Sequence, residues 1–286
     1  GSWINFTWID VNLRATPCAR RDNVSQGADD IMTLPATALP VEAPDAFLGV
    51  SHSVTGRLWR DRLDARGAAR ALAIAQRHQL PEMLARVIAG RDVEIDAVAD
   101  FLDPTIRRLM PDPFTVTQME AAAQRLADAA MRGETVAIFG DYDVDGATSA
   151  ALLAWHLRHC GLTPLIHIPD RIFEGYGPNV DAINALAAKG ATLLVTVDCG
   201  TTSIEPLAVA RQQGMSVVVI DHHQCGDDLP DVDALVNPNR PDDLSGLGHL
   251  AAVGLVLVTL VALNRELRQR GFWTPERPEP DLLNML

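Results

Sequence analysis

Residues 136–150 read VAIFGDYDVDGATSA, and this stretch decides the fold. Its first part, Val136 to Phe139, is an apolar run typical of a buried strand. Alternating carboxylates follow, and then small residues that we expect to form a helix; the carboxylates are Asp141, Asp143 and Asp145. Acids packed this closely repel one another unless a cation or a proton relieves the repulsion. A strand that leads through such a loop into a helix places the acids at the carboxyl edge of a sheet, where ligands bind in open α/β folds.

The D-x-D-x-D-G string also resembles the start of a calcium-binding EF-hand loop. An EF-hand needs a glutamate at the twelfth loop position and a helix on each side. Counted from Asp141, that position is Leu152, and the preceding segment is strand-like. A solvated acidic turn without an ion is a further alternative, and the remainder of the chain argues against it.

Length and composition narrow the possible functions. The 286 residues suffice for one large or two ordinary domains, and 48% of them are hydrophobic, enough for a sizeable core. The net charge of −13 argues against non-specific nucleic-acid binding, which depends on lysine and arginine. Metal ions in an acidic site would neutralise part of that charge, so the charge alone does not identify the partner.

The cysteines and the apolar segments indicate a reduced, cytoplasmic protein. No two of the four cysteines are spaced as CxxC, so neither a zinc knuckle nor a disulfide framework is indicated; they are Cys18, Cys160, Cys199 and Cys225. The first thirty residues lack the pattern of a signal peptide. The longest apolar run, Leu250 to Leu263, is too short to span a bilayer, and we expect it to be a buried helix that continues into NRELRQRG.

Three regions follow one another along the chain. Residues 1–46 lack periodicity and include a Pro- and Ala-rich stretch, so we expect an extension without regular structure and order beginning near Phe47. Residues 47–133 form a helical region, with helices expected at 66–78, 81–90, 94–103 and 117–133. Residues 134–286 form the α/β domain.

Within the α/β domain, strands and helices alternate. The expected strands are 135–139, 164–168, 192–197 and 216–220, and the expected helices are 147–160, 181–190 and 203–214. Because the strands are continuously apolar, we expect a parallel sheet with helices on both faces.

Polar side chains follow three of these strands where each ends. The acidic run after the first strand is matched by Asp198 after the third and by Asp221, His222 and His223 after the fourth. Because the carboxyl ends of parallel strands share one edge, these groups converge on a metal site. Oxygen ligands with one or two imidazoles suit Mn²⁺ or Mg²⁺. Asp198 could bridge two ions about 3.5–4 Å apart, an arrangement that clamps both oxygens of a phosphoryl transfer.

These motifs resemble the DHH phosphoesterase family and, within it, the RecJ group of single-strand exonucleases. The resemblance runs from about Phe47 to the end, and five motifs carry it in matching order: DYDVDG (141–146), IPDR…EGYGPN (168–179), VTVDCGTTS (195–203), IDHH (220–223) and VNPN (236–239).

The resemblance implies an α/β domain with two Mn²⁺ or Mg²⁺ ions and hydrolysis of single-stranded DNA from the 5′ end in recombination and repair. The metal ligands that it implies are Asp143, Asp145, Asp198 and His222. The further active-site groups that it implies are Asp141 and His223, with Asp221 orienting them. A single-strand-binding protein and a helicase are the further partners that we expect, and we expect a monomer.

Two departures from the family pattern matter. Many smaller family members have a histidine four residues before the first ligand aspartate, whereas this chain has Phe139, so that metal would depend more on Asp141 or on water. RecJ-like chains also continue past this point with another ligand aspartate, a second domain and an oligonucleotide-binding barrel. We therefore expect this chain to be the N-terminal catalytic part of such a protein.

The loop after the second strand supplies three candidate substrate-binding residues at the same edge. Arg171 could pair with a phosphate, Tyr176 could stack on a base, and Asn179 lies beside them. A solvated glycine-rich loop with local tyrosine packing is the alternative.

Other functions stay open at this point. The site could belong to a phosphodiesterase of short oligonucleotides or cyclic dinucleotides, to a pyrophosphatase, or to an inactive DNA-binding scaffold. A dinucleotide-binding oxidoreductase would rest on GLGHLA (246–251), a GxGxxA string that lacks the preceding strand such a site requires.

Overall fold

The computed structural model describes residues 46–285 and divides the chain into two compact units, residues 1–69 and residues 70–286. The expected extension, residues 1–46, lies outside the described residues except for its last position. The described part of the first unit begins with the short 3-10 helix η1 (Phe47–Gly49). A backbone hydrogen bond from Phe47 N to Trp59 O closes the loop that follows.

The helical region contains the expected helices with two main differences. Its elements are α1 (Ala65–His78), α2 (Glu82–Ala89), η2 (Ile95–Ala97), α3 (Val98–Leu102), α4 (Ile106–Leu109), η3 (Pro113–Thr115) and α5 (Met119–Arg132). The helix expected at 94–103 is therefore two short pieces, η2 and α3, and α4 was not expected. Gly133 ends α5 in the left-handed conformation (φ 68°), which glycine adopts without strain. The proposed boundary between this region and the α/β domain stays a prediction.

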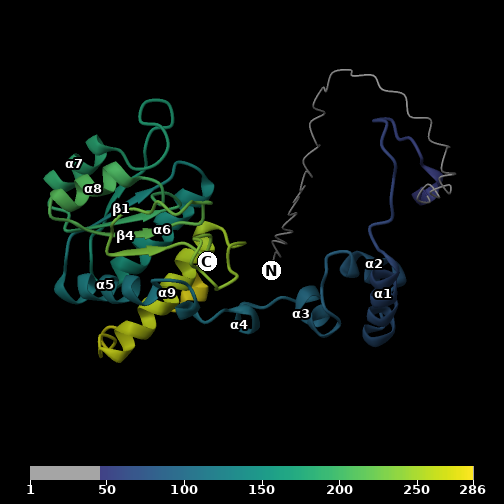
Figure 1. The fold of residues 1–286 in the computed structure, drawn as a ribbon. Coiled ribbons are helices and arrows are strands. Elements are labelled where there is room, and N and C mark those ends of the chain that lie inside the picture. The colour runs from purple at the N-terminus through teal and green to yellow at the C-terminus, as the bar shows by residue number, and fades with distance from the viewer. Residues whose placement is uncertain (1–45, 286) are drawn as a thin grey trace, which may run out of the picture. The chain divides into compact units, whose positions relative to one another are not determined.

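The sheet has five parallel strands in the order β2-β1-β3-β4-β5 (Figure 1). The strands are β1 (Val136–Gly140), β2 (Leu165–His167), β3 (Leu193–Val197), β4 (Ser216–Ile220) and β5 (Ala234–Val236). The four expected strands are all present, and the fold class predicted from the sequence is confirmed. The fifth strand, β5, was not predicted.

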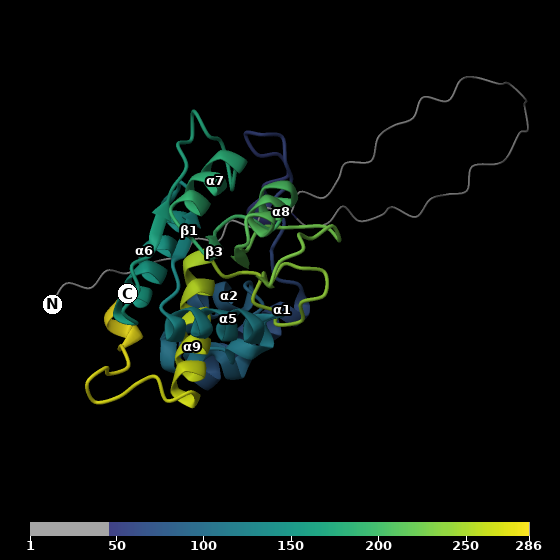
Figure 2. The same ribbon diagram turned by 90° about the vertical axis from the view of Figure 1, so that its left-hand side faces the viewer.

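Helices cover both faces of the sheet (Figures 1 and 2). They are α5, α6 (Val144–His159) and α9 (Ala252–Gln269) on one face, with α7 (Val180–Ala188) and α8 (Ile204–Gln212) on the other. Alternate residues of β1 enter the two cores: Ile138 packs with the first set of helices, and Phe139 packs with the second. This is why the central strands are apolar at nearly every position.

Helix α6 starts three residues earlier than the sequence suggested. We expected the helix to begin at Ala147, but it begins at Val144, and Asp145 lies in its first turn. The side chain of Asp143 is the N-cap and accepts a hydrogen bond from Gly146 N at 3.0 Å. The acidic run is therefore a loop, a cap and a helical turn.

The structure also bears on the expectations about membrane-spanning segments and disulfides. None of the helices among residues 46–285 combines the length and apolarity that crossing a membrane requires. The described cysteines, Cys160, Cys199 and Cys225, are free thiols.

Candidate metal centre

The register of the sheet places four polar residues in one row at its carboxyl edge. Gly140 pairs with Val197, Val197 pairs with Ile220, and Ile220 pairs with Val236. The residues that follow these paired positions form the row: Asp141, Asp198, Asp221 and Asn237. Because each strand ends at the same level, side chains separated by up to 96 positions in sequence come together.

Three carboxylates of this row and the next loop form one cluster. Oxygen atoms of Asp141, Asp143 and Asp198 all lie within 4.8 Å of one another. Asp141 and Asp198 are buried, with 4% and 2% of their surface exposed, and the Oδ1 atom of each is buried without a hydrogen-bond partner. Burial raises the pKa of both carboxyl groups. A buried carboxylate oxygen without a donor is a position that a cation can satisfy.

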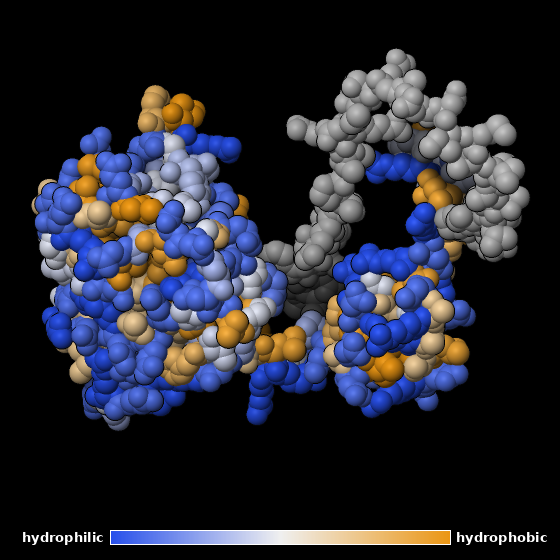
Figure 3. Space-filling view, in the orientation of Figure 1, coloured by the Kyte–Doolittle hydropathy of each residue, from blue (hydrophilic) through white to orange (hydrophobic). Residues whose placement is uncertain are grey.

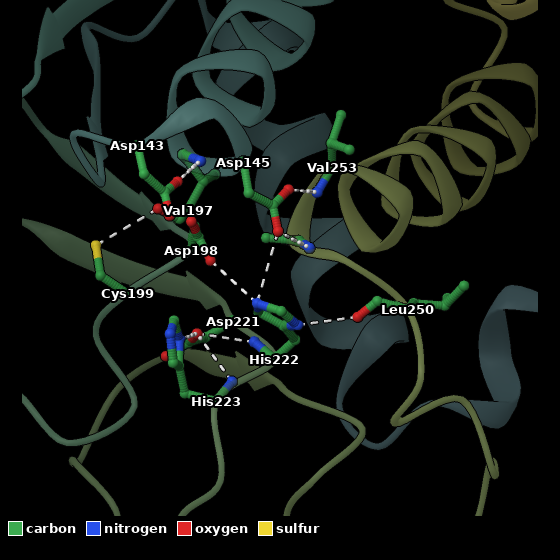
Figure 4. Close-up of polar contacts among 12 residues, drawn as sticks. Asp143, Asp145, Val197, Asp198, Cys199, Asp221, His222, His223, Leu250 and Val253 are labelled. Atoms are coloured by element: carbon green, nitrogen blue, oxygen red, sulfur yellow. Dashed lines mark hydrogen bonds and ion pairs between the residues drawn. The ribbon is translucent and has the colours of Figure 1, made fainter. Parts of the chain in front are cut away.

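The imidazole of His222 is oriented by the backbone. Its Nδ1 atom donates to Leu250 O at 3.0 Å, so the Nε2 atom carries the lone pair in the neutral ring. Nε2 lies 3.2 Å from Asp198 Oδ1 and 3.6 Å from Asp145 Oδ2 (Figure 4). The close approach of the Asp198 carboxylate raises the pKa of His222. One nitrogen lone pair therefore faces two carboxylates from different elements.

Asp145 reaches this point because the start of α9 holds it. Its Oδ2 atom accepts from Ala252 N at 2.7 Å and its Oδ1 atom accepts from Val253 N at 2.8 Å (Figure 4). These amides are orphan donors of the first turn of α9, and a carboxylate satisfies them well. Each carboxylate oxygen keeps a further lone pair for a second partner.

Asp221 serves as an acceptor for its neighbours. Its carboxylate accepts from Thr201 N at 3.0 Å, His222 N at 2.7 Å and His223 Nδ1 at 2.7 Å. Burial acts to raise the pKa of Asp221, but the hydrogen bonds from His223 and Thr201 outweigh it and lower that pKa to about 2. The hydrogen bond between His223 Nδ1 and the Asp221 carboxylate raises the pKa of His223. Asp221 thus fixes the backbone and the ring that follow it.

Thr201, Asn237 and Asn239 also support the site, although the sequence did not single them out. Asn237 donates to Thr201 Oγ1 at 3.0 Å and to His223 O at 2.9 Å. Asn239 donates to the backbone carbonyls of His222 and Gly248. The two asparagines belong to the VNPN motif, whose position directly after a short apolar run was the available signal.

The backbone around Asp198 is unusual. Asp198 has a φ of 61°, in the left-handed region that side chains other than asparagine and aspartate rarely adopt. Gly200 follows with a φ of 112°, and a Cβ atom there would lie 3.2 Å from Thr196 Cβ. The turn after β3 therefore directs a buried carboxylate into the cluster at a cost in backbone strain.

The three loop residues expected to bind substrate differ in their surroundings. Tyr176 lies at the site, because its hydroxyl is 3.3 Å from Asp198 O and 3.2 Å from His223 Nδ1. The guanidinium of Arg171 stacks over the ring of Tyr142, 5.2 Å from its centre. Asn179 caps α7, accepting from Ala182 N at 2.8 Å and donating to Glu174 Oε2 at 3.1 Å. Its amide is therefore already engaged by the protein.

The structure thus brings seven of the expected site residues together at one sheet edge: Asp141, Asp143, Asp145, Asp198, Asp221, His222 and His223. Carboxylate oxygens and one or two imidazoles are the donor set preferred by Mn²⁺ and accepted by Mg²⁺. The orphaned oxygens of Asp141 and Asp198 fit such an ion. Phe139, which stands where smaller family members have histidine, is fully buried and stacks on His167.

Comparison with known proteins identifies one family and several similar nucleases. Residues 135–283 match the family model described as the DHH family, N-terminal domain. The chain is 38% identical over 156 residues to the single-stranded-DNA-specific exonuclease RecJ of Bacillus subtilis, which covers 54% of this chain and 20% of that protein. It is 35% identical over 210 residues to the exonuclease of the same name from Salmonella typhimurium, covering 72% of this chain and 36% of that one.

A solved structure adds the fold. The crystal structure of RecJ in complex with Mn²⁺ from Thermus thermophilus matches with a TM-score of 0.56 and 25% identity, covering 70% of this chain and 28% of that one. The chain therefore spans between a fifth and about a third of the lengths of the proteins that it matches.

Proposed function

The chain belongs to the DHH family, and from this membership we propose that it is the catalytic part of a metal-dependent exonuclease that hydrolyses single-stranded DNA. The observation that supports the chemistry is the pair of buried oxygens on Asp141 and Asp198 that accept no hydrogen bond, with His222 Nε2 lying 3.2 Å from that of Asp198. The substrate class comes from the relatives, whose names describe them as single-stranded-DNA-specific exonucleases. A cleavage direction of 5′ to 3′ is part of the proposal and rests on the resemblance alone.

We assign two ion positions that share Asp198. Asp145, Asp198 and His222 would hold one ion, because Nε2 of His222 faces both carboxylates. Asp141, Asp143 and Asp198 would hold the other, because their oxygens lie within 4.8 Å of one another. Two such ions supply Lewis acidity that activates water and neutralises charge on the phosphate.

The remaining residues of the site have positioning and proton-handling roles. Asp221, held at low pKa by its hydrogen bonds, raises the pKa of His223 and fixes the direction of its ring. His223 can then donate a proton or a hydrogen bond to a phosphate oxygen, and the Tyr176 hydroxyl beside it can contact the same group. Arg171 would pair with a further phosphate of the strand.

A combined binding and cleavage experiment tests the proposal. Mn²⁺ is titrated by calorimetry, and the same preparation is assayed on single-stranded DNA carrying a label at either the 5′ or the 3′ end. We expect two ions and release of the 5′ label as a mononucleotide, with loss of cleavage when EDTA is added. One ion or none, without cleavage, would contradict the proposal. Preference for a dinucleotide over a long strand would favour the alternative phosphodiesterase.

Four other expectations stay predictions. They are residues 134–286 as the catalytic domain, a monomeric state, a cytoplasmic location, and action beside a single-strand-binding protein and a helicase. Size-exclusion chromatography with light scattering tests the monomer directly.

A further inference from the structure

The loop between β2 and α7 presents two large apolar side chains to solvent. Ile172 and Phe173 are 84% and 86% exposed. In Figure 3, apolar side chains stand at the top of the view, over the projecting loop that follows β2. Water contact with side chains of this size forgoes the stabilisation that burial would give, so their exposure needs a reason other than the stability of this domain.

The turn that carries these side chains is held by its own hydrogen bonds. Asp170 Oδ1 accepts from Ile172 N at 2.8 Å and from Phe173 N at 3.1 Å. Glu174 returns the contact, because its Oε1 atom accepts from Asp170 N at 2.9 Å. Its Oε2 atom accepts from Asn179 at 3.1 Å and lies 2.9 Å from His167 Nε2. The two apolar side chains therefore stand on a defined turn anchored to β2 and to the cap of α7.

Both flanks of the turn contact the metal centre. On one side, Arg171 stacks over Tyr142, which lies between Asp141 and Asp143 in sequence. On the other, the Tyr176 hydroxyl reaches Asp198 O and His223. Phe173 is three residues from Tyr176, a separation that extended chain spans in at most about 11 Å. A strand with its scissile phosphate at the metal centre would therefore have its neighbouring nucleotides within reach of Phe173.

We propose that Ile172 and Phe173 contact the bases of the strand beside the scissile phosphate, with Phe173 stacking on one base. This inference rests on the proposed function and deepens it by assigning base contacts to a site whose other groups address phosphates. An aromatic face accepts any base, so the contact favours unpaired nucleotides without selecting a sequence. A paired base would have to leave its stack before it could meet Phe173.

The test compares Phe173→Ala with a matched control, Leu244→Ala, which removes a side chain that is 94% exposed on another loop. The probes are a short oligothymidylate, the same strand with abasic residues, and bis(p-nitrophenyl) phosphate, which has no base. All are assayed with Mn²⁺. We expect Phe173→Ala to raise KM for the oligothymidylate about tenfold, and Phe173→Trp and Leu244→Ala to resemble the wild type. The effect should vanish on the abasic strand and on the small ester.

Two outcomes overturn the inference. One is an unchanged KM for the oligothymidylate in Phe173→Ala, and the other is an equal loss on the small ester, which would mean that the substitution disturbs the site itself. Anisotropy of the labelled oligothymidylate in Ca²⁺ separates this inference from the proposed function. Suppose that the wild-type chain does not cleave but that Phe173→Ala binds the oligothymidylate with a tenfold higher Kd. The base contact is then retained, and the proposed nuclease function is overturned. Normal cleavage with no change in Kd or KM in Phe173→Ala would retain the nuclease function and overturn the base contact.

Discussion

His222 Nδ1 donates to the backbone carbonyl of Leu250 at 3.0 Å, and this single bond decides which imidazole nitrogen faces Asp198 and Asp145. Leu250 lies 28 residues downstream, just before α9. Because a backbone carbonyl only accepts, the neutral ring must carry its proton on Nδ1. The fold therefore points Nε2 toward the two carboxylates before any ion arrives.

Replacing His222 should remove one ion position. We expect His222→Ala to bind one equivalent of Mn²⁺ fewer than the wild type, or to bind it at least tenfold more weakly, in a calorimetric titration. His249→Ala is the matched control, because His249 lies beside Leu250 on the loop before α9 and its Nδ1 atom donates to Gly246 O. Equal loss in both variants would point to disruption of the loop and away from ligation.

Ion binding should release protons in the neutral pH range. Asp198 raises the pKa of His222 above its usual 6.5, so the apo protein holds a proton on Nε2 that the ion must displace. Affinity for Mn²⁺ should therefore rise as pH increases from below 6.5 through the folded pKa and then level off. Calorimetry in buffers of different ionisation enthalpy counts the protons. A pH-independent affinity between pH 6 and 8 would contradict this.

Two substitutions of Asp143 should affect activity and stability differently. Asp143→Asn keeps an oxygen that can cap α6 but loses the charge, so we expect at least about a hundredfold loss of cleavage with unchanged stability. Asp143→Ala should lose activity equally and also about 1 kcal/mol of unfolding free energy, measured in urea. Asp181→Asn, in the first turn of α7, is the control with the same charge change. Full activity in Asp143→Asn would refute its assignment as a ligand.

Gly146 should tolerate no side chain. A Cβ atom there would lie 2.6 Å from the backbone nitrogen of Asp141, whereas a Cβ on Gly226 would meet nothing within 4 Å. We expect Gly146→Ala to cost about 1–3 kcal/mol of stability and to weaken Mn²⁺ binding, because Asp141 must shift. Gly226→Ala should leave both unchanged. Urea unfolding and calorimetry on the same two variants provide the measurement.

A histidine far from the site should make stability depend on pH. His156 is fully buried between α6 and α9, its Nε2 atom donates to Asn264 Oδ1 at 2.8 Å, and burial lowers its pKa from 6.5 to about 4. The unfolded chain binds this proton more readily, so its contribution is intact above pH 6.5 and is lost as pH falls toward 4, by about 3 kcal/mol in total. His156→Gln should show a correspondingly smaller loss between pH 6.5 and 4.5. Identical pH profiles for the two proteins would exclude this contribution.

The sequence predicted the sheet and the convergence of its acids, because apolar strands followed by acids leave a strong local signal. It did not predict β5, whose three residues, Ala234–Val236, follow an acidic segment and are strand-forming only because β4 supplies a parallel partner. It also placed the start of α6 too late. Alternating aspartates are typical of a loop, yet Asp143 caps the helix, and Asp145 lies within it because amides of α9 donate hydrogen bonds to its carboxylate.

The supporting contacts of the site could not be predicted in the same way. That Asn237 bridges Thr201 and His223 follows from the register of β4 and β5, which no local pattern encodes. The engagement of Asn179 as a helix cap likewise depends on where α7 begins. Contacts between side chains that are distant in sequence can be predicted only once the strand order and register are known.

The hold of α9 on Asp145 also has a consequence for synthesis of the chain. Ala252, one of the two amides that hold this carboxylate, is made 107 residues after it. At about 5–20 residues per second, a ribosome needs several seconds to add them. During that interval the acidic run of the nascent chain lacks the amides and, at first, His222 as well, so a divalent ion meets isolated carboxylates with little affinity for it. The proposed ion site therefore stays incomplete until the whole sheet and the start of α9 have been translated.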